Sequence, residues 1–160
     1  MPRRRVQTFL DENNVEYMIV EHSPAYAAMD VATAAHIADW ELAKTVMVRL
    51  DGKMAMAVLP ASEKVDLDAI AQAAGAKLAS AALEDEFKDL FPDCQLGAMP
   101  PFGNLYNLPV YADVSLATND LIAFNAGTHH TVIRMHYADF DRLVHPKTGQ
   151  FRVVSASAAC

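Results

Sequence analysis

From Lys44 to Leu59 the chain reads KTVMVRLDGKMAMAVL, and this stretch decides the fold. Val46, Val48 and Leu50 recur at every second position, which is the pattern of a β-strand with one apolar face. The Asp51-Gly52 pair that follows is typical of a tight two-residue hairpin turn. A second apolar run then begins at Lys53. The stretch therefore predicts a β-hairpin with strands over residues 44–50 and 53–59.

Further strands and helices are predicted on both sides of this hairpin. Short β-prone runs indicate strands at residues 17–20, 110–113, 121–124 and 131–135. Apolar residues at helical spacing indicate four or five short helices. The first contains Val6, Phe9 and Leu10; the second begins at an Asp30 cap and contains Val31, Ala34, Ala35 and Ala38; the third begins at an Asp66 cap, contains Leu67, Ile70, Ala71 and Ala74, and ends at Gly75. The fourth contains Leu83, Phe87, Leu90 and Phe91 and ends at Pro92, and the last contains Tyr137, Phe140 and Val144 and ends at His145-Pro146. Because the elements are interspersed without a regular βαβ repeat, the predicted fold class is α+β. We expect a single domain over residues 1–160, in which residues 155–160 form a fraying tail.

The composition is that of an ordinary globular domain. The 160 residues are 52% hydrophobic and 21% charged. No apolar run reaches the roughly 20 residues of a membrane helix, and the basic start at Met1–Arg5 leads into polar sequence rather than a signal-peptide core. Cys94 and Cys160 lack metal-ligand spacing and are not expected to form a disulfide. These features predict a cytoplasmic protein without membrane contact.

The formal net charge of −7 narrows the possible partners. Non-specific nucleic-acid binding needs a basic surface, so DNA is not an expected partner. A site that holds only one end of an RNA remains compatible with this charge. The cations available for such a site include Arg3, Arg4, Arg5, Lys44, Arg49 and Lys53.

Three segments are candidates for chemistry, since phosphate-binding loops, dinucleotide fingerprints, HExxH motifs and nucleophile elbows are missing from the sequence. They are Lys44-Thr45 at a strand start, the loop at residues 97–103, and residues 125–130, which connect two strands. Lys44 shares the strand side of Val46 and Val48, so its side chain either reaches the sheet edge or lines a cleft; a solvated lysine is the alternative. The segment 97–103 holds two prolines between two glycines. Such a stiff loop could present free backbone amides to a carbonyl or phosphate, or it could be a simple turn.

The histidines give a weaker signal. His129 and His130 are adjacent, so on an extended chain they point to opposite faces. His130 and His136 share a face but lie too far apart for a compact ligand pair. A solvated or core histidine is the default interpretation for each, and no metal site is predicted.

An ordered series of short motifs is more specific. It runs through Glu21-His22-Ser23-Pro24, Ala32-Thr33-Ala34-Ala35, Ala43-Lys44-Thr45-Val46, Val58-Leu59-Pro60-Ala61, Val65-Asp66-Leu67, the 97–103 loop and Ile122-Ala123-Phe124-Asn125-Ala126-Gly127. In this order the series resembles the YbaK/prolyl-tRNA synthetase-associated editing family over roughly residues 15–145.

The resemblance implies a free-standing deacylase that hydrolyses misacylated tRNA in trans, often the tRNA for proline. It implies a curved, barrel-like mixed and antiparallel sheet flanked by helices, and no metal or other cofactor. The tRNA acceptor end is the implied partner, with an aminoacyl-tRNA synthetase as an optional one. Lys44 and Gly97 take the catalytic positions, and the implied substrate-binding residues are Thr45, Pro100, Pro101, Phe102, Gly103, Asn125, Gly127, His129 and His130. The third element of the site is left open among Asn125, His129 and His130.

The aminoacyl ester is already activated, so oriented water and a stabilised oxyanion suffice for its hydrolysis. We expect amides near Gly97 to hold the carbonyl and Lys44 to hold a terminal phosphate, while pocket size selects small side chains. Two other classes stay open. One is a non-catalytic module that binds an RNA end or a nucleotide. The other is a metal hydrolase that uses His129, His130 or His136.

Overall fold

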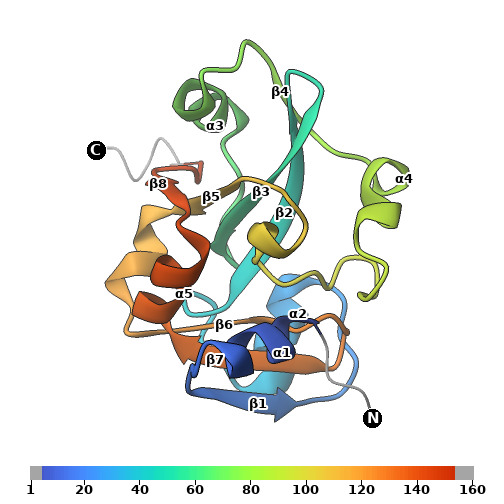
Figure 1. Ribbon diagram of the computed structural model, residues 1–160, viewed down its shortest axis with the longest axis vertical. Helices are drawn as coiled ribbons and strands as arrows, with labels where there is room; N and C mark the ends of the chain where they lie inside the picture. Colours follow the sequence, from blue (N-terminus) through green and yellow to red (C-terminus); the bar gives the residue numbers. More distant parts are fainter. Residues whose placement is uncertain (1–4, 154–160) are drawn as a thin grey trace.

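A computed structural model describes residues 5–153 of the chain (Figure 1). Arg3, Arg4 and the tail at 155–160, for which fraying was expected, lie outside the described residues. None of the helices within residues 5–153 is long and apolar enough to cross a membrane.

The predicted hairpin is confirmed. β2 (Ala43–Leu50) and β3 (Lys53–Pro60) pair antiparallel, with Leu50 opposite Lys53 at the turn. Asp51 and Gly52 have φ values of 50° and 86°, as the type I′ turn of a two-residue hairpin requires. Both faces of the hairpin are covered, since Val48 and Met47 are buried although they point to opposite sides. The hairpin is therefore the central layer of the molecule and not a one-sided surface sheet.

The strands form two sheets. The larger has the order β4 (Ala79–Ala81), β2, β3, β5 (Val110–Asp113), β8 (Lys147–Gly149), with antiparallel pairs around β2 and parallel pairs around β5. The smaller has the order β1 (Tyr17–Glu21), β7 (Thr131–His136), β6 (Leu121–Asn125) and is antiparallel. A parallel bridge between Leu42 and Ala123 links the two sheets. The α+β class is confirmed, but the strands of the described residues do not close into a barrel.

Helices lie around these sheets (Figure 1). They are α1 (Arg5–Glu12), α2 (Ala28–Ala35), α3 (Leu67–Ala74), α4 (Glu84–Phe87) and α5 (Tyr137–Val144), with 3₁₀ turns η1 (Lys88–Leu90), η2 (Gly103–Leu105) and η3 (Val114–Thr118). α3 has the predicted ends: the Asp66 carboxylate accepts from the Ala69 amide, and Gly75 ends the helix with φ 69°.

Two helix predictions are corrected. Asp30 is not the cap of α2, because the helix begins at Ala28 and its N-cap is Ala27, three residues before Asp30. Alanine is the strongest helix former, so Ala28 favours the earlier start of the helix. Asp30 lies in the first turn, where its charge suits the helix dipole. The fourth helix, expected over 83–91, is divided into the single turn α4 and the 3₁₀ turn η1.

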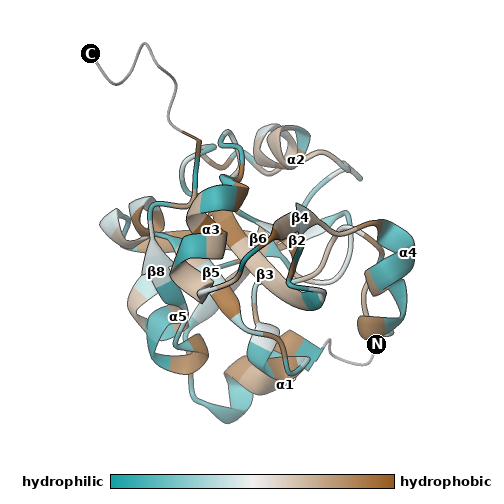
Figure 2. Ribbon diagram, turned by 90° about the horizontal axis from the view of Figure 1, so that it is seen from above, coloured by the Kyte–Doolittle hydropathy of each residue, from teal (hydrophilic) through white to brown (hydrophobic). Residues whose placement is uncertain are grey.

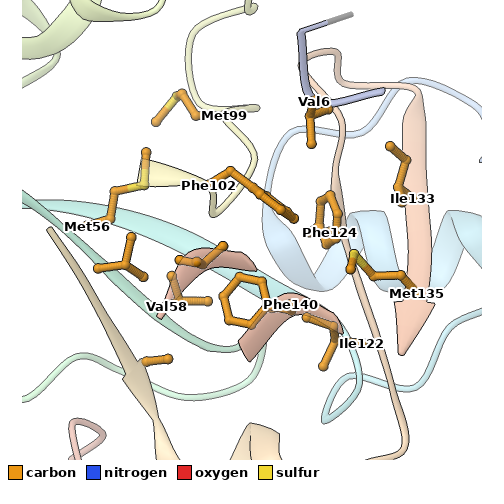
Figure 3. Close-up of a cluster of buried hydrophobic side chains, with 14 of the residues drawn as sticks. Val6, Met56, Val58, Met99, Phe102, Ile122, Phe124, Ile133, Met135 and Phe140 are labelled. Atoms are coloured by element: carbon orange, nitrogen blue, oxygen red, sulfur yellow. The ribbon is translucent and has the colours of Figure 1, made fainter. Parts of the chain in front are cut away.

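The main core lies between the hairpin, the β6–β7 pair and the helices α1 and α5. Figure 3 shows Phe102, Phe124 and Phe140 at its centre, with Met56 and Val58 from β3 beside them. Phe102 makes ring contacts at 5.3 Å to Phe124 and 5.6 Å to Phe140. Smaller apolar clusters lie under α2 and α3. Seen from above, hydrophobic segments gather around the central strands, while α4 is largely hydrophilic (Figure 2).

Candidate functional site

A gap in strand pairing marks the candidate site. On the edge that faces away from β3, β2 begins beside the Leu42–Ala123 bridge and pairs with β4 only from Val48 onward. The Ala82 amide also donates to the Met47 carbonyl. Between these points residues 43–46 have no strand partner on this edge within the described part of the chain. Lys44 and Thr45, the two site residues predicted on this strand, lie in the gap.

The end of β6 borders the gap. Leu42 and Ala123 run parallel at their bridge, so two residues further along each chain Lys44 and Asn125 occupy matching positions. Asn125 is the last residue of β6. Lys44 and Asn125 therefore each lie two residues beyond the bridge that links the two sheets.

The loop at residues 95–98 is held against the turn that follows β6. The Gln95 amide donates to the Gly127 carbonyl at 2.7 Å, and the Gly127 amide donates to the Ala98 carbonyl at 2.9 Å. In Figure 1 this loop belongs to the segment that returns from α4 toward the centre of the molecule. The loop that carries Gly97 is therefore joined to Gly127 by the backbone hydrogen bonds of Gln95 and Ala98, although the two segments are far apart in sequence.

Gly97 has the geometry that was expected from its type. Its φ is 88°, a left-handed conformation that residues with a Cβ adopt at a cost. Its amide donates to the Met99 sulfur at 3.3 Å. A thioether is a weak acceptor, so a carbonyl oxygen or oxyanion could displace it. Gly97 itself is exposed, whereas Ala98 and Met99 directly after it are buried.

His129 lies beside this glycine and is fixed from several sides. Its Nε2 is 2.8 Å from the Leu96 carbonyl and its amide donates to the Gln95 Oε1 at 2.8 Å. Its carbonyl accepts from the Ala25 amide at 3.0 Å. A Cβ built on Gly97 would lie 3.5 Å from the His129 Cε1. With Nε2 as the donor to Leu96, Nδ1 is left as a hydrogen-bond acceptor.

Four side-chain atoms on the segments around the gap are buried without a hydrogen-bond partner among residues 5–153. They are His22 Nε2, Thr45 Oγ1, Asn125 Oδ1 and His129 Nδ1. Buried polar atoms are normally paired, because leaving one unpaired costs about 1–3 kcal/mol. Arg134 Nε and the Tyr137 hydroxyl are also buried without a partner among the described residues. An unpaired buried polar atom is typical of a group that is satisfied by a ligand or by water.

Lys44 is half-buried, and its ammonium group takes part in none of the side-chain hydrogen bonds or ion pairs of the described residues. Burial lowers the pKa of its ammonium below the ordinary value, Glu63 opposes this shift, and Lys64 adds to it. Its side chain shares a face with Leu42 and Val48, whereas Thr45 points to the face of Met47 and the main core. The two neighbours therefore serve different sides of the strand.

The second half of the proline loop is part of the core. Pro100, Pro101, Phe102 and Gly103 are all buried. A Cβ on Gly103 would lie 2.5 Å from the Leu108 carbonyl oxygen and 2.6 Å from a Val110 methyl, so this glycine is required for close packing. Phe102 anchors the loop in the core, and the exposed surface of the loop is at Gln95, Leu96 and Gly97.

The histidines do not converge. His130 Nδ1 lies 3.1 Å from a Glu21 carboxylate oxygen and 3.1 Å from the Thr131 hydroxyl, on the other side of the chain from His129. His136 ends β7, six residues after His130, which at about 3.3 Å per strand residue is about 20 Å away. Within residues 5–153 no group of three or more His, Cys, Asp or Glu side chains could hold a metal ion.

Three residues of this region were not predicted from the sequence. Gln95 binds both Gly127 and His129, His22 contributes an unpaired ring nitrogen, and Tyr26 packs its ring on His129 at 4.6 Å. His22 stands in one of the quoted motifs, but the sequence assigned it no role in the site. Gln95 and Tyr26 carry no signal in their spacing, because their partners are distant in sequence. A cavity of about 620 Å³ lined by Asp120, His136 and Asp139 lies at the opposite ends of β6 and β7. It contains His136 from the metal-hydrolase alternative but none of the site residues that the family resemblance implies.

Comparison with known proteins shows the family of the chain. Residues 22–143 match the family described as the aminoacyl-tRNA editing domain. The chain is 29% identical over 154 residues to the multifunctional Ser/Thr-tRNA deacylase ProXp-y of Escherichia coli (strain K12), covering 93% of this chain and 92% of that protein.

Solved structures share the fold across nearly the full length. A crystal structure of a candidate trans-editing enzyme for prolyl tRNA synthetase has a TM-score of 0.79 at 19% identity, covering 94% of this chain and 96% of the other. The hypothetical protein APE2540 has a TM-score of 0.82 at 14% identity, with 92% and 99% covered. The family match spans most of the chain, and the chain belongs to the aminoacyl-tRNA editing domain family, a family of aminoacyl-tRNA deacylases.

Proposed function

We propose that this protein hydrolyses the ester of mischarged aminoacyl-tRNA in trans, and that it acts on tRNA carrying a small amino acid, with the tRNA for proline among its substrates. The observation that carries the proposal is the set of buried polar atoms without a partner among the described residues, on the segments that carry Lys44, Asn125 and His129. A relative that the match covers over 92% of its length is a Ser/Thr-tRNA deacylase, which supports small side chains as the amino acids removed.

The Gly97 amide is the proposed donor to the ester carbonyl. In the structure this amide donates a hydrogen bond to the Met99 sulfur. A thioether is a weaker hydrogen-bond acceptor than the oxyanion of a tetrahedral intermediate. Water attacks the carbonyl carbon, the bond to the ribose oxygen breaks, and that oxygen leaves with a proton. Stabilising the developing oxyanion is the main contribution required of the protein.

The unpaired atoms match the polar groups of an aminoacyl-adenosine end. Asn125 Oδ1 and His129 Nδ1 are acceptors and suit the α-ammonium group, which only donates. Thr45 Oγ1 both donates and accepts, so it suits a hydroxyl of the ribose or of the amino acid. Lys44, half-buried and without an ion pair among the described residues, suits the terminal phosphate.

A panel of mischarged tRNAs tests the proposal. Seryl-, threonyl- and alanyl-esters are prepared on the tRNA for proline and on the tRNAs for serine, threonine and alanine, with prolyl-tRNA and a bulky leucyl ester as controls. We expect rapid release of at least one small amino acid and no release of leucine. If no ester is hydrolysed faster than in buffer while the protein still binds the tRNA, the non-catalytic RNA-end module becomes the correct interpretation.

A further inference from the structure

We propose that Tyr26, held by His129, is the stacking platform for the terminal adenine base of tRNA. The inference rests on the proposed deacylase function, which supplies the tRNA end as ligand, and it adds a specific contact outside the group of atoms that meet the ester. Tyr26 has no role in the proposed hydrolysis.

Tyr26 is exposed in an unusual way for an aromatic residue with a fixed ring contact. Its side chain is 71% exposed, yet its ring lies 4.6 Å from the His129 ring at an interplanar angle of 50°. One side of the phenol is therefore supported by His129, and much of the ring remains open to solvent. An exposed aromatic face of this kind is the usual binding surface for an unstacked base.

The support under Tyr26 is rigid. The Ala25 amide, next to Tyr26, donates to the His129 carbonyl at 3.0 Å, and the His22 amide donates to the His130 carbonyl at 2.9 Å. The His129 ring is itself held by the Leu96 carbonyl. The segment before α2 is thus attached to the turn between β6 and β7, and Tyr26 loses little further freedom when a base binds, which favours affinity.

The His129 ring lies between Tyr26 and Gly97, whose amide is the proposed oxyanion donor. His129 contacts Tyr26 on one side, and on the other its Cε1 lies 3.5 Å from the position of a Cβ on Gly97. A nucleotide whose ester carbonyl is bound at the Gly97 amide therefore has its own base within reach of Tyr26. Because every tRNA ends in the same adenosine, a contact at this place serves any tRNA substrate.

Stacking also suits the charge of this protein. The net charge of −7 weakens attraction to the phosphate backbone. Base stacking on an aromatic ring is independent of net charge and tolerant of sequence. It supplies affinity for the single-stranded RNA end without requiring a basic surface.

The test compares two probes of acceptor-stem RNA that carry serine through a non-hydrolysable 3′ amide, one ending in adenosine and one in an abasic ribose. Dissociation constants are measured for the wild type, Tyr26→Ala, Tyr26→Phe and Trp40→Ala. We expect Tyr26→Ala to weaken binding of the adenosine probe by about 5- to 150-fold and to leave the abasic probe unchanged. Tyr26→Phe should retain binding, since the ring is kept.

Trp40 is the matched control. It is an aromatic residue that is 63% exposed, and its carbonyl accepts from the Asn119 side chain before β6, at the end of that strand opposite His129. Trp40→Ala should bind both probes like the wild type, and thermal melts should show all variants folded.

The outcomes separate this inference from the proposed function. The stacking proposal is overturned if Tyr26→Ala binds the adenosine probe normally, or if its affinity for both probes falls equally. This holds even where ester hydrolysis is observed. If the adenosine-dependent loss is seen but no mischarged tRNA is hydrolysed, the platform stands and the deacylase proposal is overturned.

Discussion

At the scale of single residues, the site depends on a backbone conformation that only glycine adopts easily. Gly97 has φ 88°, and a Cβ there would meet His129 at ordinary contact distance. The cost of adding a side chain is therefore conformational strain and not a clash. A substitution at Gly97 is therefore expected to change the loop conformation without disturbing the packing of the core.

We predict that Gly97→Ala lowers the rate of deacylation by about 100-fold, because the proposed oxyanion donor is displaced. Its stability should fall by only about 1–2 kcal/mol, the cost of a left-handed alanine. Gly75→Ala is the matched control: Gly75 has φ 69°, nothing within 4 Å of a built Cβ, and a position at the end of α3. It should show a similar loss of stability in denaturant titrations with normal activity. Equal activity of the two variants would reduce the 97–103 loop to a turn.

Lys44 is the second residue on which the account depends, and a change that keeps its charge tests its shape. We expect Lys44→Arg to reduce hydrolysis by about 100-fold, since a planar guanidinium shifts the bound phosphate and small misplacements are costly in catalysis. The melting curve should stay unchanged, because a half-buried lysine without an ion pair in the described chain adds little stability. A fully active Lys44→Arg enzyme would show that charge alone is needed there.

At the scale of elements, the C-terminal segment is held by one buried carboxylate. Asp113, at the end of β5, is 0% exposed and accepts from the Phe151 amide, the Arg152 guanidinium and Ser115. Burial by itself raises the pKa of Asp113, but these hydrogen bonds outweigh it and hold the pKa below its ordinary value. The ionised form is thus part of the fold.

The sign of this shift gives a pH dependence. A carboxyl with a lowered folded-state pKa contributes stability that is complete above its ordinary pKa of about 4 and is lost as the pH falls further. We predict that Asp113→Asn destabilises the protein by about 3 kcal/mol at pH 7, and that the difference from the wild type shrinks below about pH 4. Urea titrations across pH measure it. A difference independent of pH would mean that Asp113 acts through packing alone.

Elements with strong local signals were predictable from the sequence. The Asp51-Gly52 hairpin and the Asp66-to-Gly75 helix carry their own turn and cap residues, and both are confirmed. β4 and β8 were missed, because strands of three residues pair only where tertiary contacts bring them to a sheet edge. The expectation of a barrel-like sheet came from the family resemblance. The structure has two sheets, of three and five strands, linked by one bridge within the described residues.

The site could be predicted only in part, for a related reason. Lys44 and Gly97 stood out by strand position and by glycine-proline spacing, and their roles remain predictions. Gln95 and Tyr26 acquire their importance from His129, which is more than thirty residues away from Gln95 in sequence. The sequence around Gln95 or Tyr26 has no local pattern that predicts its contact with His129.

At the scale of the whole molecule, the acidic surface limits how RNA is bound. With a net charge of −7, long-range attraction to phosphates is weak. We predict a shallow dependence of kcat/KM on salt, in which Lys44→Ala lowers the slope of log rate against log salt concentration by about 0.7, the value for one single-strand phosphate contact. Exposed Lys53→Ala, at the far end of the hairpin, is the control. An unchanged slope in Lys44→Ala would place the phosphate elsewhere.

The most direct measurement of the central claim is single-turnover hydrolysis of the best mischarged tRNA after exhaustive chelation, with wild type and Lys44→Ala side by side. The account predicts that the chelated wild type releases the amino acid at its full rate and that Lys44→Ala, still folded by circular dichroism, is slower by about 100-fold. A wild type that loses activity on chelation and regains it with one metal ion per chain would contradict it, as would near-normal turnover in Lys44→Ala.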